Sequence, residues 1–396
     1  MPIFDQSNVV QFILKVSKLC NLRCKYCYEY PHLGDPAAMT LEQLEGMYVK
    51  LARHYGRLES PPEVHFVWHG GEPLLRPTAF YRETIRQQQM IFGGDVKAKN
   101  FIQTNLVSID DDKIDLLKHF FDGVGVSVDL FGDLRVNLAG LVRQRAVLTN
   151  MDRLNRAGVD FGCIVVLSGV NRHKLPQIFK FFEQMKISFR VLPLFAGAEP
   201  GQHGQWDITA AETAESLCAL ADLWFESDAP IDVEPLSSHI RDVLRHRMRD
   251  KVPHYHDRRE GESVVIVSTD GEVYSLADAY QPGASWGNIF SQPLDELFAG
   301  EARRRSIERT EQRMADACTR CEYFGGCSGH AAGEDNHAYR DLEGEKGQCP
   351  VVRPLLGHLN RRLEEAGFVA GDGFVDLARL AERSRTSSAR AGKFVT

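Results

Sequence analysis

Seven of the nine cysteines in this sequence fall into two tight groups with the spacing of metal ligands. The grouped residues are Cys20, Cys24 and Cys27 near one end of the chain, and Cys318, Cys321, Cys327 and Cys349 near the other. In a chain of 396 residues, such groups indicate metal ligation more than a disulfide framework. Cys163 and Cys218 stand alone, and we expect them to be buried as small hydrophobic side chains.

The first group places three thiols within eight residues, directly after a predicted strand. Three cysteine ligands leave one iron of a four-iron cubane open, and the amine and carboxylate of an amino acid can chelate that iron. Zinc is the alternative, but structural zinc sites take four ligands, and no fourth ligand is evident near Cys20 to Cys27. This group therefore predicts an iron–sulfur centre that binds a cofactor.

The spacing of Cys20, Cys24 and Cys27, with the aromatic Tyr26 just before the last cysteine, resembles the signature of the radical SAM superfamily. The resemblance implies an enzyme with two cofactors, S-adenosylmethionine and a radical SAM 4Fe-4S cluster, which together give a 5'-deoxyadenosyl radical.

The same resemblance assigns further residues to S-adenosylmethionine, namely Gly70, Gly71, Glu72, Gln103, Asn105, Ser127, Arg135 and Leu194. Two successive glycines let the backbone approach a ligand, and the carboxylate that follows them can face the ammonium of the methionine moiety. Gln103, Asn105 and Ser127 lie at predicted strand ends, which face the active site in barrels of parallel strands. For Arg135 the alternative is a solvated residue at a helix start, and for Leu194 an ordinary core leucine.

The second group supplies four thiols, which close a metal site against substrate and suit electron transfer or structural stabilisation. Its Cys-x2-Cys-x5-Cys core with a later cysteine resembles the SPASM extension of radical SAM peptide-modifying enzymes, which implies one auxiliary 4Fe-4S cluster. A four-thiolate zinc site is the alternative. A complete SPASM domain carries another auxiliary cluster, but Ser275-Leu276 and Ala331 occupy two of its ligand positions, so we expect that cluster to be absent.

The run from Ser127 to Val136 and the reduced cysteine set resemble most the cyclophane-forming maturases of FxsB or GrrM type. That resemblance implies abstraction of a Cβ hydrogen from a ribosomal precursor peptide and attack of the carbon radical on an aromatic ring. Its partners would be the precursor peptide and a ferredoxin- or flavodoxin-type reductant. Asp278, near the place where sulfatase maturases carry a basic aspartate, is the candidate catalytic base, with a surface turn as the alternative.

Two other functions remain open from the sequence. The first is oxidation of Ser or Cys to formylglycine, as in sulfatase maturases, although the missing ligands of the first auxiliary cluster disfavour it. The second is a non-catalytic protein, either an iron–sulfur electron carrier or a metal-stapled binding protein. The open three-cysteine site distinguishes the enzymes from the non-catalytic protein, because only a radical SAM enzyme needs an iron that binds S-adenosylmethionine.

The elements that must position these residues follow from the apolar pattern. Between Val9 and Leu194, short apolar runs alternate with stretches of helical period, which predicts an α/β fold with a partial (β/α)6 TIM barrel as radical SAM core. The predicted strands are Val10 to Val16, Glu63 to Trp68, Asn100 to Thr104, Gly123 to Val128, Phe161 to Leu167 and Phe189 to Leu192. The predicted helices begin at the Thr40 capping box and near Thr78, Asp110, Leu138 and Asn171.

We divide the chain into a radical SAM core (1–200), linker helices with the SPASM-like auxiliary cluster domain (201–352), and a C-terminal helix with a disordered tail (353–396). The linker helices span Ala210 to Phe225 and Leu236 to Arg249, and a hairpin is predicted around Thr269 to Glu272. The few residues before the first strand leave no room for an N-terminal leader-binding domain, so we expect another surface, such as an exposed sheet edge, to bind the leader.

Composition excludes some classes of protein. A formal charge of -7 gives no indication of nucleic-acid binding, and no apolar run is long enough to span a membrane. The N-terminus lacks an export pattern, so we expect a cytoplasmic protein.

Overall fold

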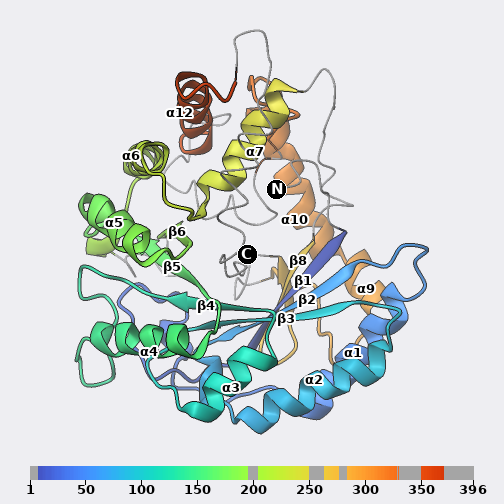
Figure 1. Ribbon diagram of the computed structural model, residues 1–396. Coiled ribbons are helices and arrows are strands. Elements are labelled where there is room, and N and C mark those ends of the chain that lie inside the picture. The colour runs from blue at the N-terminus through green and yellow to red at the C-terminus, as the bar shows by residue number, and fades with distance from the viewer. Residues whose placement is uncertain are drawn as a thin grey trace.

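The computed structural model describes residues 8–194, 204–248, 263–275, 283–327, 329 and 349–369. Its strands are β1 (Val9–Ser17), β2 (Glu63–Gly70), β3 (Ala98–Thr104), β4 (Gly123–Ser127), β5 (Gly162–Leu167), β6 (Phe189–Pro193), β7 (Val233–Glu234), β8 (Val264–Val267) and β9 (Val273–Ser275). They form one sheet in the order β7-β6-β5-β4-β3-β2-β1-β8-β9 (Figure 1). All neighbouring strands are parallel except β8 and β9, so the predicted α/β fold is confirmed.

The helices are α1 (Leu41–Tyr55), α2 (Thr78–Phe92), α3 (Asp111–His119), α4 (Gln144–Ala157), α5 (Leu175–Met185), α6 (Ala210–Glu226), α7 (Leu236–Arg247), α9 (Leu294–Ala299), α10 (Glu301–Arg313) and α12 (Val352–Glu365). Helices α1 to α3 cover one face of the sheet (Figure 1), and α10 packs beside the edge strand β9. Helix α1 starts with the predicted capping box, in which Thr40 and Gln43 bond each other's backbone N–H. Helix α12 packs on α6 and α7.

The sheet separates two apolar layers, because successive side chains of a strand point to opposite faces. Phe12, Leu14 and other outward residues pack with the helices in the large core. A smaller cluster on the inner face contains Ile13, Val67, Phe101, Ile266 and Tyr274.

On the inner face, polar side chains follow this apolar cluster towards the carboxyl ends of the strands. Ile13 of β1 pairs with Val67 of β2, and two residues later Lys15 pairs with His69. By the same period of two, Lys15 and His69 share the inner face with the apolar pair. The strands therefore present polar groups at the inner, carboxyl-terminal end of the sheet, which is where active sites of parallel α/β barrels lie.

The six predicted strands agree with β1 to β6 to within two residues at each end. The prediction of a helix near Leu138 is wrong, because α4 begins at Gln144. The Asn137 side chain accepts hydrogen bonds from the N–H groups of Ala139 and Leu141, and Gly140 has a φ of 74°, so these residues form a turn instead. The helix expected near Asn171 begins at Leu175, after one 3-10 turn.

The sheet continues beyond the first predicted domain, since β7, β8 and β9 lie after residue 200 and β8 pairs with β1. The predicted boundary at 200 lies outside the described residues, and the division into domains stays a prediction. The hairpin around Thr269 to Glu272 joins β8 and β9 as predicted. The C-terminal tail lies outside the described residues. Among the residues that the structure describes, no helix is long and apolar enough to span a bilayer.

Candidate functional site

The three-cysteine loop follows the carboxyl end of β1 and is held in place largely by its backbone. The Arg23 N–H donates to Val136 O at 2.7 Å, and the Lys25 N–H donates to Leu134 O at 2.9 Å. The Arg23 guanidinium also donates to Cys20 O at 2.8 Å, across the loop itself. These bonds hold the loop against residues 134–136 and across its own turn.

Burial makes all three thiols poor acids in the absence of a cation. It raises the pKa of Cys20 to about 11 and that of Cys27 to about 12, and it also raises the pKa of Cys24. Metal is ligated by thiolates rather than by thiols. In this buried pocket, a positively charged metal centre must therefore stabilise the negative charge of the thiolates. The three thiols fit an iron–sulfur cluster in this respect.

The Gly70-Gly71-Glu72 segment contacts the start of the cysteine loop. The Gly71 N–H donates to Ser17 O and the Glu72 N–H to Leu19 O, both at 2.8 Å. A Cβ on Gly70 would lie 2.3 Å from Ser17 O, and a Cβ on Gly71 would lie 2.3 Å from Leu19 O. Close approach to residues 17–19 therefore requires both glycines, and their expected role beside S-adenosylmethionine stays a prediction.

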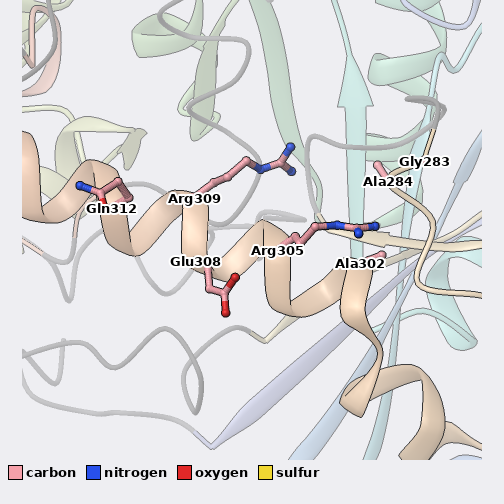
Figure 2. Close-up of a pocket in the computed structure, with 7 residues that line it drawn as sticks. All are labelled: Gly283, Ala284, Ala302, Arg305, Glu308, Arg309 and Gln312. Carbon is pink, nitrogen blue, oxygen red and sulfur yellow. The ribbon is translucent and has the colours of Figure 1, made fainter.

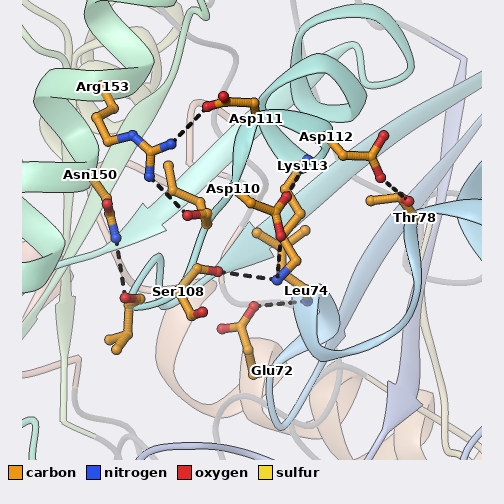
Figure 3. A network of polar contacts seen from close by, with 12 residues as sticks. Glu72, Leu74, Thr78, Ser108, Asp110, Asp111, Asp112, Lys113, Asn150 and Arg153 are labelled. Atoms are coloured by element: carbon orange, nitrogen blue, oxygen red, sulfur yellow. Dashed lines mark hydrogen bonds and ion pairs between the residues drawn. The ribbon is translucent and has the colours of Figure 1, made fainter.

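Glu72 connects the ends of two strands rather than pointing freely into the site. Its Oε1 accepts hydrogen bonds from the Leu74 N–H at 2.9 Å (Figure 3) and from the Thr104 hydroxyl at 2.8 Å. Its Oε2 accepts from the Asn105 N–H at 2.7 Å. Burial raises the pKa of Glu72, which is 2% exposed. A carboxylate offers about four acceptor positions, so one remains for the ammonium expected there.

Gln103 and Ser127, on neighbouring strands, are brought together as expected. The Gln103 Nε2 donates to Ser127 Oγ at 2.7 Å. Gln103 Oε1 is buried and has no hydrogen-bond partner within the described ranges. A buried, unpaired carbonyl oxygen on the inner face fits a hydrogen-bond donor of a bound cofactor.

Asn105 lies against the cysteine loop. Its Nδ2 donates to Asn21 Oδ1 at 2.7 Å and is 3.7 Å from Cys20 Sγ. The segment after Asn105 is held from α4, where Asn150 donates to Leu106 O and Arg153 to Ile109 O, both at 2.9 Å (Figure 3). The loop after β3 is therefore braced against α4.

Arg135 is buried, so the alternative of a solvated arginine is wrong. Its Nη1 donates to the Tyr26 hydroxyl at 2.9 Å and lies 3.7 Å from Asp129 Oδ2. The Tyr26 hydroxyl in turn donates to Asp129. Burial raises the pKa of Asp129, although Arg135 and Tyr26 oppose that rise. The sequence analysis assigned no role to Asp129. The signal that could have identified it is its position two residues after Ser127, the last residue of β4.

Leu194 and Asp278 add little to the described site. Leu194 is half-buried after β6, and its N–H donates to Leu167 O at 2.8 Å. Asp278 lies outside the described residues, as do Leu276 and Ala331.

Lys15 and Glu29 were missed by sequence reasoning. Lys15 Nζ lies 2.6 Å from Glu29 Oε1 and 3.3 Å from His69 Nδ1, and both members of the ion pair are 2% exposed. The available signal was a lysine in the apolar run from Phe12 to Val16. A charged residue inside such a strand is costly to bury unless it is paired.

The second cysteine group sits against α7 and the main core. Cys321, Cys327 and Cys349 pack against buried core residues, and a Cβ on Gly326 would lie 2.7 Å from His246 N of α7. Burial raises the pKa of Cys327 to about 12, and the Cys349 and Cys318 thiols lie near enough to add to the rise. The fold thus brings Cys349 back to the other cysteines of its group, which fits a four-thiolate centre.

Within the part of the chain that the structure describes, no three His, Cys, Asp or Glu side chains converge on one point for a single metal ion. The ligands of a cubane bind different irons, so they need not converge in this way. A cavity of about 380 Å³ lies elsewhere, against α10, with Arg305 and Arg309 on its wall (Figure 2). None of the predicted site residues lines it.

Comparisons with known proteins show a family and relatives that this chain resembles. Residues 14–182 match the profile of the Radical SAM superfamily. A serine-type anaerobic sulfatase-maturating enzyme of Bacteroides thetaiotaomicron is 25% identical over 358 residues, which cover 84% of this chain and 84% of that protein.

Two solved structures share the fold. The structure of native anSMEcpe with bound AdoMet and Kp18Cys peptide has a TM-score of 0.70 at 19% identity, and the match covers 91% of this chain and 99% of that one. Streptococcus suis SuiB bound to precursor peptide SuiA has a TM-score of 0.55 at 15% identity, over 87% and 74% of the two chains. The protein is therefore a radical SAM enzyme, not the non-catalytic iron–sulfur protein that the sequence left open.

Proposed function

We propose that this enzyme oxidises a side chain of a peptide at Cβ. The observation that carries the proposal is the position of the three-cysteine loop at the carboxyl end of β1, beside the inner-face side chains of β1 to β4. When bound, the 4Fe-4S cluster and S-adenosylmethionine supply a 5'-deoxyadenosyl radical that removes a hydrogen atom. Support for a peptide substrate comes from the peptides present in the two solved relatives.

The residues of the chain then have distinct tasks. Cys20, Cys24 and Cys27 hold the cluster, and Glu72 keeps one acceptor position for the ammonium of S-adenosylmethionine. Gln103 Oε1, which lacks a partner within the described residues, accepts from a donor of the same cofactor. Gly70, Gly71, Asn105, Ser127, Arg135 and Leu194 line or support this cofactor site.

The second cysteine group holds one auxiliary 4Fe-4S cluster, through Cys318, Cys321, Cys327 and Cys349. Loss of a hydrogen atom leaves a carbon radical, which must shed one electron and one proton to give a stable product. The auxiliary cluster suits the electron, and a carboxylate such as Asp278 suits the proton. A ferredoxin- or flavodoxin-type protein would reduce the radical SAM cluster from outside.

Two products satisfy this balance. Oxidation of Ser or Cys to formylglycine is favoured by the sequence match to the serine-type sulfatase-maturating enzyme, which covers 84% of each chain. A bond from Cβ to an aromatic ring, the cyclophane, is favoured by Ser275, whose hydroxyl bonds Ser306 Oγ at 3.0 Å where a complete SPASM domain would carry a cluster ligand. A chain with fewer auxiliary clusters fits the cyclophane-forming type better.

The experiment is peptide turnover by the reconstituted and chemically reduced enzyme. The probes are synthetic peptides with one Ser or Cys near an aromatic residue, and matched peptides with Ala in place of Ser or Cys. Crosslinking, or oxidation of Ser, gives a product two hydrogens lighter. Oxidation of Cys to formylglycine also removes two hydrogens and, through hydrolysis of the thioaldehyde with release of sulfide, replaces sulfur by oxygen. A hydrazide probe labels the formylglycine aldehyde but not a cyclophane. Unchanged peptide masses, with deoxyadenosine formed only by abortive cleavage, would contradict the proposal.

A further inference from the structure

A buried charge cluster connects the two ends of the cysteine loop. Lys15 lies on β1, five residues before Cys20, and its ammonium donates to the Tyr28 hydroxyl and to Glu29 Oε1, the latter at 2.6 Å. Tyr28 and Glu29 follow Cys27 directly. One side chain therefore joins the strand that enters the loop to the residues that leave it.

The third member of the cluster comes from β2. His69 Nδ1 lies 3.3 Å from Lys15 Nζ and accepts a hydrogen bond from the Gly70 N–H at 2.8 Å. Gly70 begins the Gly-Gly-Glu segment, whose backbone bonds residues 17 and 19. Lys15 thus contacts the residues that follow the cysteine loop on one side and, on the other, the residue that precedes the Gly-Gly-Glu segment.

Stability does not account for these charges. Replacement of a buried ion pair by apolar side chains of similar volume is often neutral or stabilising. Lys15 Nζ and Glu29 Oε1 nevertheless lie 2.6 Å apart, with side chains only 2% and 3% exposed. Glu29 Oε1 bonds Lys15, whereas Glu29 Oε2 is buried without a hydrogen-bond partner within the described ranges, so the buried charge is only partly compensated.

We propose that Lys15 is a positioning residue for radical initiation: by joining β1 to Tyr28 and Glu29, it sets the geometry of the cysteine loop around its cluster. The inference does not depend on the identity of the peptide. Replacement of Lys15 should affect abortive cleavage of S-adenosylmethionine as well as productive turnover, because both reactions require the same cluster geometry. Residues that orient metal ligands commonly change affinity or activity by about 10- to 100-fold when they are replaced.

The test uses the full chain, reconstituted with iron and sulfide, and S-adenosylmethionine as the only added ligand. The main variant is Lys15→Met combined with Glu29→Leu, which removes both charges and leaves no unpaired ion. Lys15→Arg is the conservative variant, and Lys18→Met is the matched control. Lys18 carries an ion pair to Asp35 at 3.2 Å beside the same loop, but this pair is partly exposed.

The readouts are the thermal midpoint, the iron content, the electron paramagnetic resonance spectrum of the reduced cluster with and without S-adenosylmethionine, and the rate of deoxyadenosine formation. We expect the double variant to keep its fold but to lose about tenfold or more in deoxyadenosine formation, with a smaller spectral response to S-adenosylmethionine. Lys15→Arg should recover much of the rate. A folded double variant with the wild-type spectrum and rate would overturn the proposal. If the double variant does not fold, Glu29→Gln, which removes the charge of the carboxylate and keeps its shape, decides. A folded Glu29→Gln protein with a lower rate and a smaller spectral response supports the proposal, and one with the wild-type rate and spectrum overturns it.

Discussion

The Glu72 carboxylate accepts a hydrogen bond from the backbone N–H of Asn105 at 2.7 Å, and so it joins the end of β2 to the end of β3. Its other oxygen accepts from the Thr104 hydroxyl and from the Leu74 N–H. A residue that resemblance assigns to the cofactor thus also braces the sheet edge that carries the site. The two tasks can be separated by mutation.

Glu72→Gln should destabilise the fold by about 1–3 kcal/mol, because the new amide NH₂ faces a donor wherever it is placed. Thr104→Val is the comparison, since it removes one neutral hydrogen bond and should cost about 1 kcal/mol. Urea unfolding of the metal-free proteins measures both. A Glu72→Gln protein of unchanged stability that no longer binds S-adenosylmethionine would show that the brace is unimportant.

Gly71→Ala should prevent formation of the first cluster. Its Cβ would lie 2.3 Å from Leu19 O and 2.5 Å from Lys18 O, and these are backbone atoms that cannot move without displacing the start of the cysteine loop. Gly46→Ala is the matched control, because nothing lies within 4 Å of its Cβ on the exposed face of α1, and it should stabilise the helix by about 1 kcal/mol. Iron content after reconstitution is the measurement. Full iron loading of Gly71→Ala would contradict the close approach seen here.

The strands were predictable because apolar runs and β-branched residues mark them, and the cysteines because thiol spacing is so specific to metal sites. The contacts within the site were not. No pattern shows that Glu72 bonds three donors, that Arg135 meets Tyr26 and Asp129, or that Gly71 approaches Leu19. Such contacts depend on strand register and on the path of loops, which single residues do not encode. The turn at Asn137 likewise displaced a helix start, because its side chain bonds the backbone locally.

His69 should make the protein less stable in acid. Burial is the main cause that lowers the pKa of His69 to about 3, and the Lys15 ammonium is the second. The pKa of an unfolded histidine is about 6.5. Between these values the unfolded state binds the proton and the folded state does not, so this contribution is complete above about pH 6.5 and is lost as the pH falls. The slope is at most about 1.4 kcal/mol per pH unit, and less because His69 is partly exposed.

His69→Gln, which keeps an acceptor for the Gly70 N–H, removes this dependence. The free energy of unfolding of the metal-free wild type should therefore fall more steeply between pH 7 and pH 5 than that of the variant. The difference between the two proteins cancels the titration of other groups. Parallel pH profiles would show that the folded His69 titrates as an unfolded one does.

The iron content distinguishes the expected cluster set from a complete SPASM domain. One radical SAM cluster and one auxiliary 4Fe-4S cluster give about eight irons per chain, whereas a further auxiliary cluster would give about twelve. Cys24→Ala and Cys327→Ala should each lower the count by about four, and Cys163→Ala, which changes a buried thiol within the core, should leave it unchanged. Only Cys24→Ala should abolish cleavage of S-adenosylmethionine outright, because the open iron belongs to the first loop. Tightly bound zinc in the wild type, with about four irons, would instead assign the second group to the zinc alternative.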